Sequence, residues 1–565
     1  MREETAARWA GWIQLMRAHP YVSLALACLA AAFMTDQTAG ALLTPEGLML
    51  GAAVIVAGAL ICWRRAGHRL EARLKTAAAA VGAALALALA ALLGRSANAA
   101  AWFTLIALLA LGAIAACLAV RRRLTWRRAA CLLLAAGFVL RLGYVLYTDI
   151  QTRQHDVAWM GAGTGHMGYI EYFVQYRRLP DFDPRSHWQF YHPPLYHILS
   201  AVVYSALAWI DMETPRIGES LQFVTLFYSS ACIVLAYRIF RQMGLERWGL
   251  VTALALVCFY PMFIQLAGGL NNDILSITFM LAAVLYTLRW YKEHTLRHIL
   301  CAALFMGLGM MTKLSAALLA PAMAWVFLAG LFRAPAAQRR GIWLEFAAFF
   351  ALCAPLGLWW PLRNWAVFGM PLNYVAEIGK DSGQYIGHID AVKRMFDFSA
   401  YQFRQLYEAW GQPYQEFNMF VGLLKTGVFD EQTFTDIQPL IYGPSRALFS
   451  ASIALVPACL LAALRRLLRR DEALPGALRG FWILLPVTLL FSYIQLNLRY
   501  PQTCTANMRY VMPLVIVAGY FLGSLWQGTL LNAKAGRLIR IAAGGLAALF
   551  CLSSAVVYVM LGIAA

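Results

Sequence analysis

Two acidic residues stand where a carboxylate could carry out proton transfer at a membrane surface. Asp156 lies in a hydrophilic loop directly after His155, and Asp273 follows two asparagines ahead of an apolar run. A hydroxyl group is a poor nucleophile, and a carboxylate within hydrogen-bond reach can accept its proton as a new bond forms. The alternative for Asp156 is a solvated acid that caps the next short helix. Asp156 and Asp273 are therefore the candidate catalytic residues.

Basic residues near the same loops are candidates for holding an anionic group. Lys313 lies between two short apolar runs, where its amine could extend to the headgroup region or meet a lipid phosphate. Arg216, Arg499 and Arg509 flank other apolar runs. We expect these bases on the outer side, where they need a local anionic partner, either an acidic side chain or a phosphate.

The elements that must carry these residues are membrane helices. Of the 565 residues, 61% are hydrophobic and 13% are charged, and the mean hydropathy is +0.61. A soluble globule does not need that much apolar surface, so a polytopic membrane protein is indicated. The net charge of +19 comes from basic clusters between apolar runs, a pattern that sets membrane orientation and does not indicate nucleic acid. The 11 cysteines fall mostly in apolar runs and are interpreted as small buried residues.

About fifteen apolar runs approach the roughly 20 residues needed to cross a bilayer. With the N-terminus in the cytoplasm and the first helix retained, the main basic clusters fall on the cytoplasmic side. This assignment requires residues 195–210 to form an interfacial helix that does not cross. The predicted spans are residues 21–33, 48–63, 76–93, 101–120, 129–147, 217–240, 250–266, 274–291, 299–311, 314–331, 343–362, 448–464, 481–496, 510–526 and 539–563.

The runs divide into two parts. Residues 1–124 are predicted to form an accessory bundle of about four Ala-rich spans, and residues 125–565 a catalytic membrane core of about eleven. The core carries two long outer loops, at about residues 148–215 and 363–446, and loops of this length are usually functional. The predicted fold class is an all-α polytopic membrane protein with interfacial helices in the first outer loop.

The order of several short motifs resembles the C-type (GT-C) glycosyltransferases. The likeness is to bacterial relatives of the protein O-mannosyltransferases and of the lipid A aminoarabinose transferase (the PMT-like, family 39 group), over about residues 129–565. One departure is that protein mannosyltransferases usually follow the first-loop aspartate with glutamate, whereas Val157 follows Asp156 here. The motifs are Asp156, His192-Pro193-Pro194-Leu195-Tyr196, Arg216, Asn272-Asp273, Gly307-Leu308-Gly309 before Thr312-Lys313, Arg363-Asn364-Trp365 before Phe368-Gly369-Met370-Pro371, and Arg509-Tyr510.

The resemblance implies a GT-C fold and inverting transfer of a hexosyl or pentosyl group from a polyprenyl-phosphate sugar to an acceptor hydroxyl. Asp156 would be the general base, and Asp273 would orient the acceptor or a basic residue. The expected partners are the lipid-linked donor, a glycan, lipid or protein acceptor, and membrane lipids, without nucleic acid, metal or cofactor. The expected location is a bacterial inner membrane, with the site facing the periplasm or exterior. The implied substrate-binding residues are His155, His192, Tyr196, Arg216, Lys313, Arg499 and Arg509.

A polytopic transporter or lipid flippase is the alternative function. Such proteins bind substrate near the bilayer midplane, often with broken helices and internal repeats. Few ionisable residues fall near mid-span here, Glu219 and Glu345 being the nearest, and the hydropathy shows no two-fold repeat. A non-catalytic scaffold would leave the outer bases and the long loops without explanation. An enzyme requires Asp156 and Lys313 to line one outward cavity.

Overall fold

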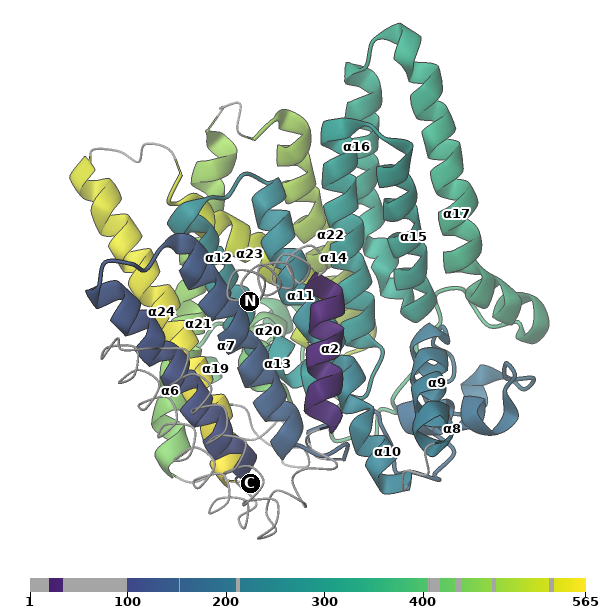
Figure 1. The fold of residues 1–565 in the computed structure, drawn as a ribbon. Coiled ribbons are helices and arrows are strands. Elements are labelled where there is room, and N and C mark those ends of the chain that lie inside the picture. The colour runs from purple at the N-terminus through teal and green to yellow at the C-terminus, as the bar shows by residue number, and fades with distance from the viewer. Residues whose placement is uncertain are drawn as a thin grey trace, which may run out of the picture.

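The computed structural model of the chain describes residues 20–33, 99–151, 153–209, 214–404, 406, 417–431, 439–469, 474–527 and 533–564. These described residues form helices and irregular segments. Among them, one isolated antiparallel β-bridge joins Tyr385 to Gln502. The long helices run roughly side by side through the height of the molecule (Figure 1). The predicted all-α class is confirmed.

Nine helices in the described chain are long and apolar enough to cross a membrane, or up to eleven if two bent pairs are counted as spans. The prediction of a polytopic membrane protein is therefore confirmed. The bent pairs join α12 (Arg247–Phe259) to α13 (Pro261–Gly268), and η4 and η5 (Thr503–Thr505, Met508–Val511) to α23 (Pro513–Ser524). The other spans contain α6 (Ala99–Val120), α7 (Trp126–Tyr147), α10 and α11 (Thr214–Ser220, Gln222–Gln242), α14 (Asp273–Glu293), η3 and α16 (Leu314–Leu319, Ala320–Arg333), α17 (Ala336–Phe368), α21 (Pro439–Leu468), α22 (Gly476–Arg499) and α24 (Ala533–Ala564).

One predicted core span is shorter than the others. Helix α15 (Leu296–Thr312) has 17 residues, a length of about 25 Å. It packs along α14 and α17 and returns the chain to the end at which α14 begins. When α15 is counted with the bent pairs, the described core agrees with the eleven predicted helices. In the N-terminal part the structure describes α2 (Pro20–Phe33) and α6, and the predicted spans 48–63 and 76–93 lie outside the described residues.

The first outer loop folds into short helices at one end of the molecule (Figure 1). It contains α8 (Gly165–Tyr176), η2 (Pro184–Ser186) and α9 (Leu195–Trp209). One face of α9 packs on α8, while Val202 and Trp209 are exposed. The 15 residues of α9 reach about 22 Å, and the helix packs against α8 of the same outer loop. The predicted non-crossing helix is therefore supported, and its position at a membrane surface stays a prediction.

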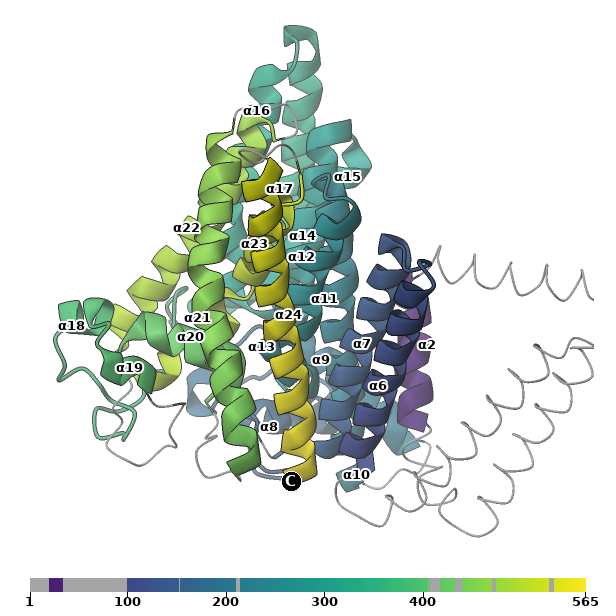
Figure 2. The same cartoon turned by 90° about the vertical axis from the view of Figure 1, so that its left-hand side faces the viewer.

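The second outer loop is shorter than predicted, because α17 continues to Phe368 and α21 begins at Pro439. Between them lie α18 (Ala391–Phe396), α19 (Ala400–Arg404) and α20 (Met419–Phe429), which Figure 2 shows on one side of the bundle. Much of α20 is buried, including Lys425. It therefore delivers the residues at its C-terminal end, Asp430 and Glu431, to the interior of the protein.

A buried arginine stabilises the bend between α12 and α13. Pro261 has no N–H, and the 45° bend leaves the last carbonyls of α12 without helical donors. Arg141 of α7 is fully buried and donates to the carbonyl oxygens of Cys258 (2.7 Å) and Val257 (3.2 Å), and to the Ser229 hydroxyl (2.9 Å). Arg141 thus caps a broken span whose second half leads into Asp273.

We expect Arg141→Met to lower the free energy of unfolding by about 2–4 kcal/mol, because two buried carbonyls lose their donors. Thermal or denaturant unfolding of the purified protein in nanodiscs measures the change. Arg127→Met is the matched control, since Arg127 is exposed on the same helix, and it should change stability by less than about 0.5 kcal/mol. Equal stability of the two variants would contradict the capping role.

Candidate active site

A cavity of about 1280 Å³ lies between the two outer loops, the start of α14, the end of α15 and the segment from α22 to η5. It brings together residues that are far apart in the sequence. Asp156 and Lys313 both line it, the arrangement that we expect of an enzyme. Seven of the nine predicted site residues are among its lining: His155, Asp156, His192, Asp273, Lys313, Arg499 and Arg509.

Tyr196 and Arg216 are not among the described residues that line the cavity. Tyr196 is buried, and its ring meets that of His166 edge-on at 6.4 Å, so it supports the wall from behind. Arg216 is exposed in the first turn of α10. The geometry therefore does not support the substrate contacts predicted for these two residues. Arg499 does reach the cavity, with its guanidinium 5.3 Å from the Tyr500 ring centre.

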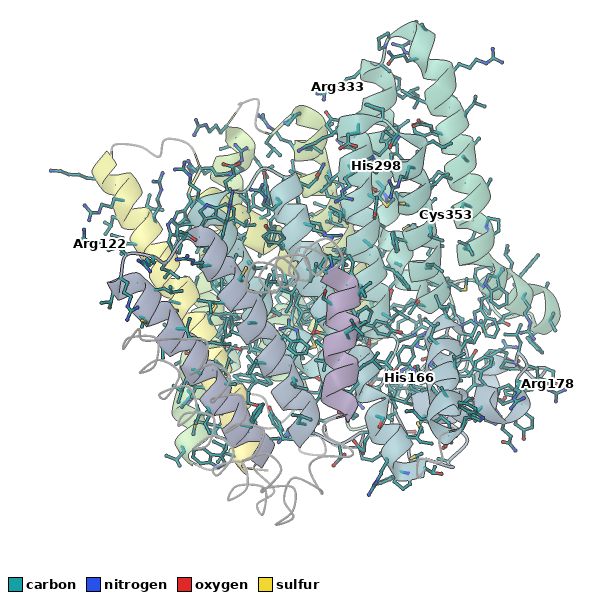
Figure 3. The ribbon with its side chains drawn as sticks, in the orientation of Figure 1. Arg122, His166, Arg178, His298, Arg333 and Cys353 are labelled. Carbon is teal, nitrogen blue, oxygen red and sulfur yellow. The ribbon has the colours of Figure 1, made fainter. Side chains whose placement is uncertain are left out.

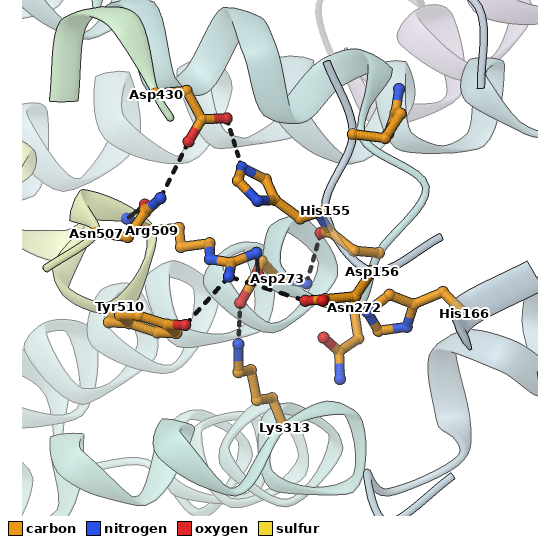
Figure 4. A network of polar contacts seen from close by, with 12 residues as sticks. His155, Asp156, His166, Asn272, Asp273, Lys313, Asp430, Asn507, Arg509 and Tyr510 are labelled. Atoms are coloured by element: carbon orange, nitrogen blue, oxygen red, sulfur yellow. Dashed lines mark hydrogen bonds and ion pairs between the residues drawn. The ribbon is translucent and has the colours of Figure 1, made fainter. Parts of the chain in front are cut away.

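Arg509 lies between the two predicted catalytic acids (Figure 4). Its Nη1 is 3.8 Å from Asp273 Oδ2, and its Nη2 is 3.9 Å from Asp156 Oδ2. The Lys313 amine forms an ion pair with the other oxygen of Asp273. The Asp273 side chain is 5% exposed and that of Asp156 is 33% exposed. Asp156 is thus the acid available to a molecule in the cavity, whereas Asp273 is enclosed by cations.

The start of α14 and the end of α15 hold the buried ion pair in place. Asp273 is the first residue of α14, where the helix dipole favours a carboxylate. Its N–H donates to the Asn271 side chain (3.1 Å), and the Asn272 amide donates to the Thr312 carbonyl (3.1 Å). These bonds fix the two helix ends side by side. Lys313, the residue after α15, therefore lies opposite Asp273.

The loop that carries Asp156 is held against the start of α8. Asp156 adopts a left-handed backbone (φ 59°), and its carbonyl accepts the His166 N–H at 2.8 Å. Its carboxylate accepts the Trp188 indole N–H at 3.1 Å. Gly165 (φ 71°) permits this close packing, because a Cβ there would lie 2.5 Å from a loop carbonyl oxygen. The N-cap of α8 is Thr164, so the alternative reading of Asp156 as the helix cap is wrong.

The surroundings keep Asp156 ionised. Burial acts to raise the pKa of its carboxyl group, but Arg509, His166, His155 and the Trp188 hydrogen bond act in the opposite direction. The balance holds the pKa below its usual value. At neutral pH, Asp156 is therefore a carboxylate with a proton-accepting oxygen.

Next to Asp156 lies a stack of histidines. The His166 ring is parallel to those of His192 (6.1 Å) and His197 (5.2 Å), and its Nδ1 is hydrogen bonded to His197 Nε2 at 2.9 Å. Burial lowers the pKa of His166 to about 4 and those of His192 and His197 well below their usual value. His166 and His192 line the cavity as neutral rings, which suits hydrogen bonding to an uncharged polar ligand.

Sequence reasoning missed the residues around His155 as site residues. Asp430 and Glu431 directly follow α20, and the Asn507 amide donates to both carboxylates, at 3.0 and 2.8 Å. The donor atoms of His155, Asp430 and Glu431 lie within 4.8 Å of one another, a spacing that a cation could exploit. However, Nε2 of the ring faces Asp430 at 2.6 Å and Nδ1 faces Glu431 at 3.7 Å. The imidazole therefore faces each acid with a different nitrogen, and ion pairing within the chain accounts for this cluster.

The sequence model of the dolichyl-phosphate-mannose-protein mannosyltransferase family matches residues 202–359. The matched stretch runs from α9 to α17 and contains Asp273 and Lys313. It confirms the predicted resemblance to this branch of the C-type glycosyltransferases for that part of the chain. No curated protein sequence matches the chain significantly.

Two solved structures are similar to the chain at 13% sequence identity. One is the archaeal oligosaccharyltransferase AglB from Archaeoglobus fulgidus, in complex with an inhibitory peptide and a dolichol-phosphate, with a TM-score of 0.44 over 77% of this chain. The other is an Archaeoglobus fulgidus oligosaccharyltransferase tethered to an acceptor peptide, with a TM-score of 0.41 over 75% of this chain. The chain spans 56% and 55% of these two proteins, respectively.

We expect Lys313→Met to lower the free energy of unfolding by about 3 kcal/mol, because it leaves the Asp273 carboxylate buried with only the more distant Arg509. Adding Asp273→Leu should restore stability to within about 1 kcal/mol of the unsubstituted protein. Unfolding of the single and double variants in mixed micelles measures this. A double variant that loses as much as the two single variants together would contradict the pairing.

Proposed function

We propose that the protein is an inverting glycosyltransferase that moves a sugar from a polyprenyl-phosphate donor to an acceptor hydroxyl. The observation that carries this proposal is that the ionised carboxylate of Asp156 and the cations of Lys313 and Arg509 share one cavity. A base for the acceptor and cations for a departing phosphate are what displacement at an anomeric carbon requires. The match to the mannosyltransferase family over residues 202–359 supports a donor of this class.

In the proposed reaction, Asp156 accepts the proton of the acceptor hydroxyl as its oxygen attacks the anomeric carbon. The attack comes from the face opposite the phosphate, so the configuration inverts. The bond between the anomeric carbon and the phosphate oxygen breaks, and the polyprenyl phosphate leaves with the electron pair. When the phosphate shares the charge of Arg509, the pKa of Asp156 rises, which makes it a better base at the moment of transfer.

The cations have capacity for a phosphate. Arg509 lies beyond hydrogen-bond distance of both acids, and among the described residues its buried Nε has no hydrogen-bond partner. Arg509 and Lys313 each lie 5.1 Å from the Tyr510 ring centre, so the same aromatic ring stabilises both cations. Both oxygens of Asp273 face these cations, so we assign Asp273 the role of orienting them and not that of the base.

The cavity wall also suits a lipid chain. Leu314 and Leu318 of η3, and Leu489 and Leu496 of α22, line it from elements that belong to membrane spans. A polyprenyl tail could therefore lie against these side chains while its phosphate meets Arg509 and Lys313. The sugar class that we propose is hexosyl or pentosyl, and the acceptor is a hydroxyl-bearing glycan, lipid or protein.

We infer that the site faces away from the cytoplasm, in a bacterial inner membrane. Figure 3 shows His166 and Arg178 in the lower part of the view, Arg333 near the top, and Arg122 at the left, above the level of His166. Arg122 lies in the short basic connection between α6 and α7, and Arg333 is the last residue of α16, just before the chain turns into α17. Basic residues at such turns are typical of the cytoplasmic side. The cavity lies at the opposite end, next to His166.

One observation favours the second candidate, a lipid transporter. Two spans are bent, by 45° and 55°, and broken helices are common in transporters. In this protein, however, one bent span (α12–α13) precedes Asp273 and the other (η4–η5 with α23) contains Arg509. Both residues line the cavity together with Asp156. Vesicles that carry the protein and a polyprenyl-phosphate sugar distinguish the two functions, because a transporter moves the lipid across without cleaving it.

We expect Asp156→Asn to reduce kcat for sugar transfer by at least about 100-fold, because a general base contributes about 10²–10⁴ to the rate. Asp181→Asn is the matched control, since Asp181 is exposed in the same outer loop and its partner is Arg178. The assay follows a radiolabelled polyprenyl-phosphate sugar into acceptors in purified membranes. Full transfer by the Asp156 variant, with the control also active, would refute the assigned role.

A further inference from the structure

The His155 imidazole occupies an unusual position between two buried acids. It is 9% exposed, and each of its nitrogens faces a different carboxylate, Asp430 at 2.6 Å and Glu431 at 3.7 Å. A neutral imidazole carries one N–H and satisfies one of these acids, whereas an imidazolium presents an N–H to both. The second arrangement also supplies a positive charge where two carboxylates are buried.

The charges that face His155 favour the imidazolium. Burial and Arg509 act to lower its pKa, but Asp430 and Glu431 act to raise it, and the result is a raised pKa. Burial acts to raise the pKa of both acids. At Asp430 the imidazole, together with Arg509 and Asn507, outweighs burial and the pKa is lowered, whereas the pKa of Glu431 stays raised. Asp430 is therefore the main partner, in agreement with the shorter distance.

This cluster anchors one side of the turn that carries Asp156. His155 directly precedes Asp156, whose left-handed φ of 59° turns the chain. The carbonyl and carboxylate of Asp156 bond to His166 and Trp188, so the other side of the turn is held by α8 and the loop after it. The contacts of His155 thus restrain the peptide before Asp156 from the side opposite α8.

We infer that His155 is a positioning residue: as an imidazolium held between Asp430 and Glu431, it anchors the turn that directs the Asp156 carboxylate into the cavity. This inference rests on the proposed function, in which Asp156 is the base. His155 acts through Asp156, so its loss changes turnover more than donor binding. Activity should also decline as the pH rises through the pKa of His155, because the deprotonated imidazole has one N–H and can no longer donate to both carboxylates.

Asp430→Asn tests the inference, because Asp430 is not among the described residues that line the cavity. The substitution keeps the shape and removes the charge, which lowers the pKa of His155. We expect kcat to fall by about 10- to 100-fold with the donor KM changed less than about twofold. The alkaline decline in kcat should move to lower pH. Asp430→Glu, which keeps the charge, should retain more activity and the original pH profile, and Asp181→Asn should match the unsubstituted protein.

Hydrogen exchange of residues 150–165 in nanodiscs gives a readout that does not depend on catalysis. Asp430→Asn should speed exchange there while leaving α14 and α15 unchanged. Unaltered kcat, pH profile and exchange in Asp430→Asn would overturn the inference while leaving an inactive Asp156→Asn variant as support for the proposed function. Retained transfer by Asp156→Asn would overturn both. A third outcome would also overturn the inference about His155. If a chelator abolishes activity, and Mn²⁺ restores it in the unsubstituted protein but not in Asp430→Asn, then the cluster holds a cation.

Discussion

The arrangement of this protein depends on one shared cation. Arg509 lies between Asp156 and Asp273, and Lys313 completes the neutralisation of Asp273. Charges taken out of water are tolerated only when opposite charges face them closely. Four separate segments must therefore meet at one point: the loop after α7, the start of α14, the end of α15 and the turn η5. The packed membrane helices hold these four segments close together.

The charged groups divide the cavity into regions with different chemistry. Neutral histidine rings lie on one side of Asp156, and cations lie on the other. Apolar side chains of η3 and α22 continue the wall toward the membrane spans. A sugar, its phosphate and a lipid tail present the same sequence of properties: uncharged and polar, anionic, then apolar. The groups that line the cavity therefore agree in chemistry with the three parts of the proposed donor.

Hydropathy was sufficient to predict the helical membrane core, because each span must satisfy its backbone within the helix. Charged residues near the ends of apolar runs are conspicuous in the sequence, and this pattern predicts Asp156, Asp273, Lys313 and Arg509 as site residues. The bends were not predicted, although Pro261 lies within the predicted span 250–266. The sequence does not predict that α20 is buried, because this helix lies in a stretch that reads as a hydrophilic loop. The burial of α20 is what gives Asp430, Glu431 and Asn507 their roles in the site. Motif order predicts substrate contacts for Tyr196 and Arg216, but it does not reveal that Tyr196 lies behind the cavity wall and Arg216 on the surface.

The ion pair between α14 and α15 has a consequence for biosynthesis. Asp273 and Lys313 are 40 residues apart, on two consecutive antiparallel helices. If these two helices enter the bilayer as one hairpin, Lys313 can neutralise Asp273 at that stage. Neutralisation of Asp273 then does not require the C-terminal helices. Among the described residues, the cation paired with Asp156 is Arg509, which belongs to η5 and is synthesised more than 350 residues later. Until then Asp156 can stay hydrated in an outer loop, so assembly can leave the reactive carboxylate in water until the last helices dock.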